Sequence, residues 1–121
     1  MPTNVLVVDD VIATCHVLAR CLAVIGANVE CAESGMKALK SMAQIRPSLV
    51  FLDYMMPEMD GLEVLRRMRA DVALKTIPVV MFTANESAKF RAEAEQLGAI
   101  GILIKGNASL NDFQQYVSLV Q

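Results

Sequence analysis

The chain has 121 residues with a formal net charge of -2, and 55% of them are hydrophobic and 20% charged. This length suits a single domain, and the hydrophobic content is enough for a sizeable core, which excludes a disordered chain. The negative net charge argues against direct binding of nucleic acid. No charge-free stretch reaches the about 20 residues of a membrane span and no basic segment marks a signal peptide, so we expect a soluble, cytoplasmic protein.

In the first half of the chain, apolar runs alternate with segments of helical periodicity. The predicted elements, in order, are a strand at Val5–Val8, a helix at Val11–Ile25, a strand at Asn28–Ala32, a helix from the cap Ser34 through Ile45, and a strand at Ser48–Leu52. Gly26 is placed to end the first helix, as glycine often does. The residues expected to face the core from the two helices are Ile12, Cys15, Leu18, Ala19, Leu22, Ile25, Met36, Leu39 and Met42.

The same alternation continues in the second half of the chain. The predicted elements are a helix that starts near Gly61, a strand at Val79–Phe82, a helix at Glu86–Leu97, a strand at Ile100–Ile104 and a helix at Leu110–Val120. Asn85 and Ser109 are placed to cap the last two helices, and Gly98 is placed to end the first of those two. The residues expected to face the core are Leu62, Leu65, Met68, Leu110, Phe113, Val117 and Val120.

Five predicted strands therefore alternate with five predicted helices. The strands are continuous apolar runs, which is typical of a parallel sheet covered by helices on both faces. This pattern predicts a doubly wound α/β domain, a single (βα)5 unit with five parallel strands and right-handed crossovers. We expect this one domain to occupy residues 1–121, with no further module.

The three cysteines are Cys15, Cys21 and Cys31. Their odd number and the lack of a C-x-x-C pair fit neither a disulfide framework nor a zinc site. Cys15 and Cys21 lie six residues apart on a predicted helix, so they point to different faces. We expect three reduced thiols that act as small core residues.

Polar residues stand at the C-terminal ends of four predicted strands, where open parallel sheets form their sites. Asp9 and Asp10 follow the first strand, and Asp53 follows the third. Thr83 follows the fourth strand and Lys105 ends the fifth. Taken singly, each aspartate is typical of a helix cap and the lysine of a solvated charge. Taken together, they predict three acids, a hydroxyl and an amine at one edge of the sheet.

Such a cluster suits metal-assisted phosphoryl transfer. Three carboxylates repel one another unless a cation intervenes, and Mg²⁺ prefers oxygen ligands. With the two adjacent acids near one ion, Asp53 can use one oxygen as a ligand and the other as a nucleophile. Lys105 can neutralise phosphoryl charge, while the Thr83 hydroxyl and the Ala84 amide can donate hydrogen bonds to phosphoryl oxygens.

Four motifs run in order along nearly the whole chain. They are Asp9-Asp10 after a strand, the segment Asp53-Tyr54-Met55-Met56-Pro57-Glu58-Met59-Asp60-Gly61, Thr83-Ala84, and Gly98-Ala99 ahead of Ile104-Lys105. Together these motifs resemble those of the response regulator receiver domain of two-component signalling. The pattern D-x-x-M-P-x-M-D-G is the most specific of the four.

The resemblance implies a flavodoxin-like sheet with strand order 2-1-3-4-5 and Mg²⁺-dependent phosphoryl transfer to Asp53. The donor would be a phosphohistidine on a histidine kinase or a histidine phosphotransfer protein. Mg²⁺ would be held by Asp10, Asp53 and the backbone carbonyl of Met55, with Asp9 assisting. Such a domain is not a conventional enzyme, because it catalyses only its own phosphorylation and dephosphorylation. Its phosphorylated form modulates a downstream protein or effector domain.

Two other functions stay open. One is a receiver-like interaction module that binds partners without a working phosphorylation cycle. The other is a small phosphatase or nucleotide-binding protein on a similar sheet. The second is disfavoured because the sequence contains neither G-x-x-x-x-G-K-[ST] nor G-x-G-x-x-G.

Two residues depart from the family pattern, and both bear on output switching rather than on phosphoryl acceptance. Gly106 follows Lys105 where the family usually has proline, and Ile102 stands where an aromatic switch residue is common. We expect a trans Lys105–Gly106 bond, because a cis bond to a residue other than proline costs about 2.5–4 kcal/mol. We also expect Ile102 to stay packed. The resemblance further places Met55 and Asn85 beside the path of a hydrolytic water.

Overall fold

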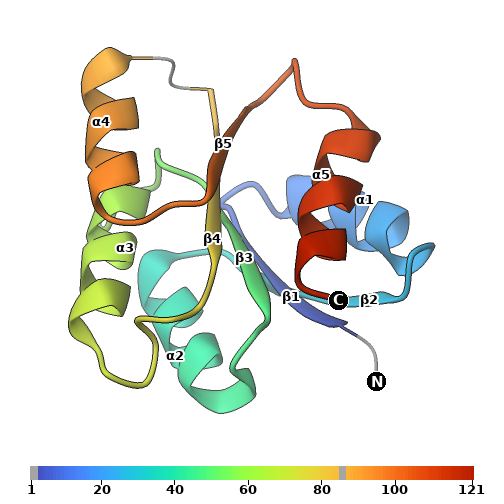
Figure 1. The fold of residues 1–121 in the computed structure, drawn as a ribbon, viewed down its shortest axis with the longest axis horizontal. Helices are drawn as coiled ribbons and strands as arrows, with labels where there is room; N and C mark the ends of the chain where they lie inside the picture. Colours follow the sequence, from blue (N-terminus) through green and yellow to red (C-terminus); the bar gives the residue numbers. More distant parts are fainter. Residues whose placement is uncertain (1–2, 85–86) are drawn as a thin grey trace.

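Five parallel strands form one sheet, in the order β2-β1-β3-β4-β5, in the computed structural model, which describes residues 3–84 and 87–121 (Figure 1). The elements are β1 (Thr3–Val8), α1 (Ile12–Ala23), β2 (Ala27–Ala32), α2 (Gly35–Ile45), β3 (Leu49–Leu52), α3 (Gly61–Ala70), β4 (Val79–Thr83), α4 (Ala88–Gln96), β5 (Gly101–Ile104) and α5 (Leu110–Leu119). Each strand pairs with its neighbours in parallel. The predicted doubly wound α/β fold and its strand order are confirmed.

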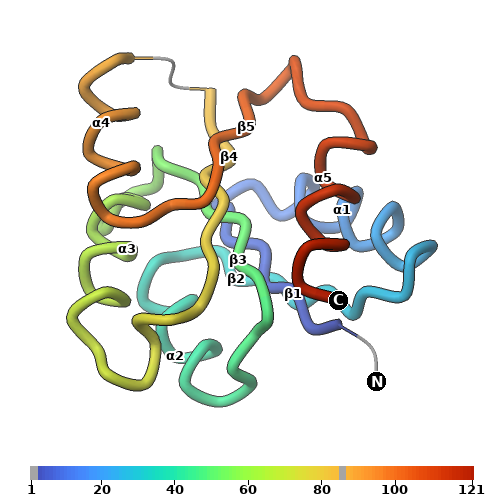
Figure 2. The backbone as a smooth tube through the Cα atoms, viewed as in Figure 1, coloured from blue at the N-terminus to red at the C-terminus, as the bar shows by residue number. Residues whose placement is uncertain are grey.

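Helices cover both faces of the sheet. α1 and α5 lie on one face, and α2, α3 and α4 lie on the other (Figures 1 and 2). Successive residues of a strand point to opposite faces, so Leu6 packs in the cluster under α2, α3 and α4 while Val7 packs in the cluster under α1 and α5. Both faces are therefore dry, which explains why the central strands are continuous apolar runs. Among the helices that the structure describes, none is long and apolar enough to cross a membrane.

Side-chain caps define where several helices begin. The Ser34 hydroxyl accepts the Lys37 amide at 3.2 Å, and Ser109 forms a capping box with Asp112 at the start of α5, so both predicted caps are confirmed. The predicted cap Asn85 and the first predicted helical residue, Glu86, lie outside the described residues. In the described part, α4 begins at Ala88 and is capped by Ser87, which accepts the Phe90 amide at 3.1 Å.

Three side chains predicted to face the core are exposed instead. Ile12, Met36 and Leu110 are 41%, 60% and 43% exposed. Each is the first or second residue of its helix. In α2 the buried face is formed by Gly35, Ala38 and Met42 instead.

The prediction of three reduced cysteines is wrong for two of them. Cys15 and Cys31 form a disulfide between α1 and β2, with their Cα atoms 5.9 Å apart, and Cys21 is the free cysteine among the described residues. A Cα separation of this size is ordinary for a disulfide. The bond joins a helix to a strand 16 residues away, so spacing within one helix gave no sign of it.

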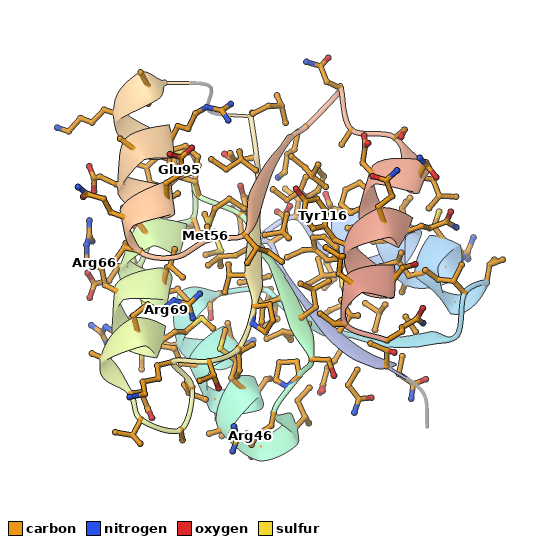
Figure 3. All side chains as sticks on the ribbon, viewed as in Figure 1. Arg46, Met56, Arg66, Arg69, Glu95 and Tyr116 are labelled. Carbon is orange, nitrogen blue, oxygen red and sulfur yellow. A yellow bond between two sulfur atoms is a disulfide. The ribbon has the colours of Figure 1, made fainter. Side chains whose placement is uncertain are left out.

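Arg69 joins two loops that position β4 and β5 (Figure 3). From α3, its Nε donates to the Leu97 carbonyl at 2.7 Å and its Nη2 donates to the Gly98 carbonyl at 3.3 Å. Its Nη1 donates to the carbonyls of Lys75 and Ile77, both at 3.0 Å. One guanidinium thus ties the loop before β4 to the loop before β5.

Candidate functional site

The polar residues predicted at the strand ends gather at the C-terminal edge of the sheet. Asp9 directly follows β1 and Asp53 directly follows β3, and these two strands are neighbours. Thr83 is the last residue of β4, and Lys105 directly follows β5. The Lys105 amide donates to the Thr83 carbonyl at 2.8 Å, so the strand pairing extends to the site itself.

Lys105 connects the two buried aspartates. Its Nζ lies 2.7 Å from Asp9 Oδ2 and 3.3 Å from Asp53 Oδ2. Asp9 and Asp53 are only 1% and 4% exposed, so the ammonium group compensates charges that water does not reach. Because β5 lies two strands away from β3, this contact depends on the long, unbranched lysine side chain.

Three carboxylates form an acidic cluster at this edge. Asp9, Asp10 and Asp53 each offer an oxygen, and these oxygens lie within 4.8 Å of one another. Both Asp9 oxygens accept hydrogen bonds, Oδ1 from the Val11 amide at 2.9 Å and Oδ2 from Lys105. Asp10 is exposed. A hard divalent cation suits this donor set, because it takes carboxylate oxygens and keeps several waters on the open side.

Burial and charge set the protonation of the site. Burial, with the charges of Asp9 and Asp10, raises the pKa of Asp53 to about 6, against the opposing effect of Lys105. Burial lowers the pKa of Lys105, but its hydrogen bond to Asp9 and the charge of Asp53 outweigh burial and leave that pKa raised. At neutral pH the site therefore holds a charged amine beside an ionised Asp53 carboxylate.

The raised pKa of Asp53 predicts that the contribution of this residue to the free energy of unfolding falls as pH rises. Between the ordinary value of 3.8 and about 6, the folded chain binds this proton more tightly than the unfolded chain does. Ionisation therefore destabilises the fold progressively across this window. In metal-free buffer, we expect Asp53→Asn to gain about 1–3 kcal/mol relative to wild type between about pH 4 and about pH 7. Urea unfolding of both proteins at the two pH values measures this difference, and a pH-independent difference would contradict the assigned protonation.

Gly61 supports the loop that carries Asp53, a role that the sequence did not indicate although Gly61 ends the D-x-x-M-P-x-M-D-G motif. A Cβ at this position would overlap the backbone carbonyl oxygen of Asp53. The Gly61 amide donates to the Tyr54 carbonyl at 2.8 Å, and the Asp60 carboxylate caps α3 by accepting the Glu63 amide at 2.9 Å. The Asp-Gly pair therefore holds the start of α3 against the backbone of the acidic site. The visible signal was the D-G dipeptide, which composition alone interprets as a turn.

The other predicted site residues occupy different environments. Thr83 is fully buried, the next residue Ala84 is exposed, and the Met55 side chain is 63% exposed two residues after Asp53. The Tyr54 ring stacks on Phe90 of α4 with centroids 4.5 Å apart, a contact that the sequence did not indicate.

The two departures from the family pattern have clear structural outcomes. Residues 3–84 and 87–121 contain no cis peptide bond, so the Lys105–Gly106 bond is trans as predicted. Gly106 has a φ of 92°, a left-handed conformation that favours glycine. Ile102 is half-buried and packs against the cluster under α2, α3 and α4, as expected.

The fold and the site define a flavodoxin-like α/β domain with an acidic cluster and a lysine at the C-terminal edge of its sheet. A family model described as the response regulator receiver domain matches residues 5–117, and the chain belongs to this family. The response regulator MprA of Mycobacterium sp. (strain KMS) is 41% identical over 105 residues, which are 87% of this chain and 45% of that protein. The chain thus spans less than half the length of this curated relative.

Solved structures are similar over nearly the whole chain. The chemotaxis protein CheY4 of Vibrio cholerae, crystallised at low pH, superposes with a TM-score of 0.90 at 28% identity and covers 100% of both chains. The N-terminal domain of a response regulator receiver protein from Methanoculleus marisnigri JR1 gives a TM-score of 0.79 at 32% identity, covering 96% of this chain and 92% of that one. The protein is a receiver domain of the two-component response regulators.

Proposed function

We propose that Asp53 accepts a phosphoryl group from a phosphohistidine on a histidine kinase or histidine phosphotransfer protein. The observation that carries this proposal is the Asp53 carboxylate, 4% exposed, ionised at neutral pH and 3.3 Å from the Lys105 ammonium beside two further acids. Residues 1–121 then act as one cytoplasmic receiver domain that modulates a downstream protein or effector domain. It catalyses only its own phosphorylation and dephosphorylation, and it contacts neither nucleic acid nor membrane.

Magnesium is the cofactor that the acidic cluster fits. Asp10, Asp53 and the backbone carbonyl of Met55 would hold it. Asp9 would assist by orientation, because both of its oxygens already accept hydrogen bonds. When bound, Mg²⁺ supplies neutralisation of negative charge on the phosphoryl oxygens.

The chain's own residues supply the nucleophile, a positive charge and hydrogen-bond donors for the transfer. An Asp53 oxygen attacks phosphorus as the bond from phosphorus to the donor nitrogen breaks. Lys105, held by Asp9 at 2.7 Å, places positive charge beside the accepted group. The Thr83 hydroxyl and the Ala84 amide, which come directly at the end of β4, donate hydrogen bonds to phosphoryl oxygens.

Direct phosphorylation tests the proposal. The full chain is incubated with Mg²⁺ and acetyl phosphate, and its intact mass is then measured. We expect one added phosphoryl group, which chelation of Mg²⁺ prevents. An unmodified chain under conditions where it is folded would overturn the proposal and favour an interaction module without a phosphorylation cycle.

The lifetime of the phosphorylated state is expected to depend on Met55. This exposed thioether lies two residues after Asp53 and cannot orient a water as an amide can. We expect Met55→Asn to speed loss of the phosphoryl group about threefold to tenfold, measured as decay of the phosphorylated mass. The matched control is Val72→Asn, an exposed apolar residue before β4 at the opposite edge of the sheet. Equal decay of the two variants would contradict this role of Met55.

A further inference from the structure

The Cys15–Cys31 disulfide joins α1 to the edge strand of the sheet. Cys15 lies on the buried side of α1 and is 1% exposed, whereas Cys31 in β2 is half-buried. Both residues pack in the apolar cluster under α1 and α5. The bond closes a loop with a sequence separation of 16, and this loop contains most of α1 and the turn into β2.

The same disulfide restrains the segment that carries Asp9 and Asp10 of the acidic cluster. Asp9 is tied to β2 at one end, because its amide donates to the Ala32 carbonyl at 3.1 Å. Cys15 is tied to β2 at the other end through Cys31, the residue before Ala32. The segment between these two ties contains the exposed Asp10 and the first turn of α1. The cross-link therefore limits how far this segment can move from the sheet.

We propose that Cys15 and Cys31 form a reversible thiol–disulfide site, and that its reduction by a small-molecule thiol loosens residues 9–15. The site lies outside the phosphoryl-accepting machinery, and its chemistry does not depend on that function. Cys21, a free cysteine on the same helix, is not part of it.

Reduction proceeds by two exchanges at sulfur. A thiolate attacks Sγ of Cys31, which belongs to the more exposed of the two residues, and the bond between the protein sulfurs breaks. Cys15 leaves as a thiolate and takes a proton from water. A second thiolate then attacks the mixed disulfide, releases the oxidised small molecule and leaves Cys31 reduced. A small-molecule disulfide reverses both exchanges.

The fold is expected to persist without the cross-link. A reduced Cys15 is a small apolar residue that suits its buried position in the core. What changes is the restraint on the loop, because a disulfide acts mainly by limiting the freedom of the chain that it closes. Asp9 then depends on its hydrogen bond to Ala32 and on the packing of α1 against the sheet.

Thiol counting tests the redox site. The full chain is equilibrated with oxidised or with reduced glutathione, then unfolded in urea with excess N-ethylmaleimide, so that the buried Cys15 can also react, and weighed intact. We expect one alkylated cysteine after oxidation and three after reduction, and Cys21→Ala should lower each count by one. Three reactive cysteines under both conditions would overturn the proposal.

Hydrogen exchange tests the effect on the acidic segment. We expect the unfolding midpoint to fall by roughly 10 °C after reduction. We expect the exchange of amides of residues 9–15 to increase about tenfold more than that of α3 amides, which follow only the global loss of stability. Cys31→Ser should behave as the reduced protein in both buffers, whereas Cys21→Ala should respond like wild type. Equal exchange of residues 9–15 in the oxidised and the reduced protein would overturn the proposed effect of the disulfide on this segment. No Mg²⁺ or phosphodonor is present, so this failure is distinguishable from failure of phosphorylation.

Discussion

Asp53→Asn is expected to reduce phosphoryl uptake from acetyl phosphate to background while the domain stays folded. An amide has nearly the same shape as a carboxylate, so it fits a position that is 4% exposed. It lacks the anionic oxygen that attacks phosphorus, and it weakens the acidic cluster as a metal site. Intact mass after incubation with Mg²⁺ and acetyl phosphate measures the loss, and circular dichroism checks the fold.

The matched control is Asp71→Asn. Asp71 is an exposed aspartate in the turn after α3, where its carboxylate accepts the Ala73 amide at 2.8 Å. Asparagine can make the same turn contact, so stability and phosphorylation should both match wild type. A phosphorylated Asp53→Asn protein would show that another residue accepts the group and would refute the assigned site.

The position of the site was predictable because the fold class determines where strand ends meet. Once the strands are parallel and β1, β3, β4 and β5 are neighbours, Asp9, Asp53, Thr83 and Lys105 must lie at one edge. The division of labour within the acidic pair was not predictable. Asp9 and Asp10 are adjacent in the sequence, and only the course of the chain into α1 buries Asp9 against Lys105 and leaves Asp10 exposed.

The sequence failed where a contact depends on tertiary neighbours. The Cys15–Cys31 bond requires α1 to pack on β2 so that these two residues lie side by side. The periodicity within each element contains no information on that packing. Helical periodicity also assigned Met36 and Leu110 to the core, although a stripe says nothing about where the sheet beneath it ends. The close approach of Gly61 to the Asp53 carbonyl was also not predictable. A glycine in a turn can be required for its backbone conformation or for a close contact, and the sequence does not distinguish the two.

Gly61→Ala is expected to destabilise the domain by about 3 kcal/mol, although alanine is the better helix former at an ordinary helical position. The added Cβ would overlap the Asp53 carbonyl oxygen, a backbone atom at the end of β3 that cannot rotate away. Relief requires the start of α3 or the Asp53–Tyr54 backbone to shift. We therefore expect slower phosphorylation of the folded variant by acetyl phosphate, together with a lower midpoint in urea.

Gly35→Ala provides the matched control at the first residue of α2. Its Cβ would lie 2.9 Å from Met59 Sδ and 2.9 Å from Val64 Cγ2, which are side-chain atoms rather than backbone. The methionine sulfur can move, but Val64 is fully buried and β-branched, so we expect a loss of about 1–2 kcal/mol, smaller than that of Gly61→Ala, and an unchanged phosphorylation rate. If both variants lost the same stability, the Asp53–Tyr54 backbone would have to yield as easily as a methionine side chain. The contact between Gly61 and Asp53 would then not be what positions the acceptor carboxylate.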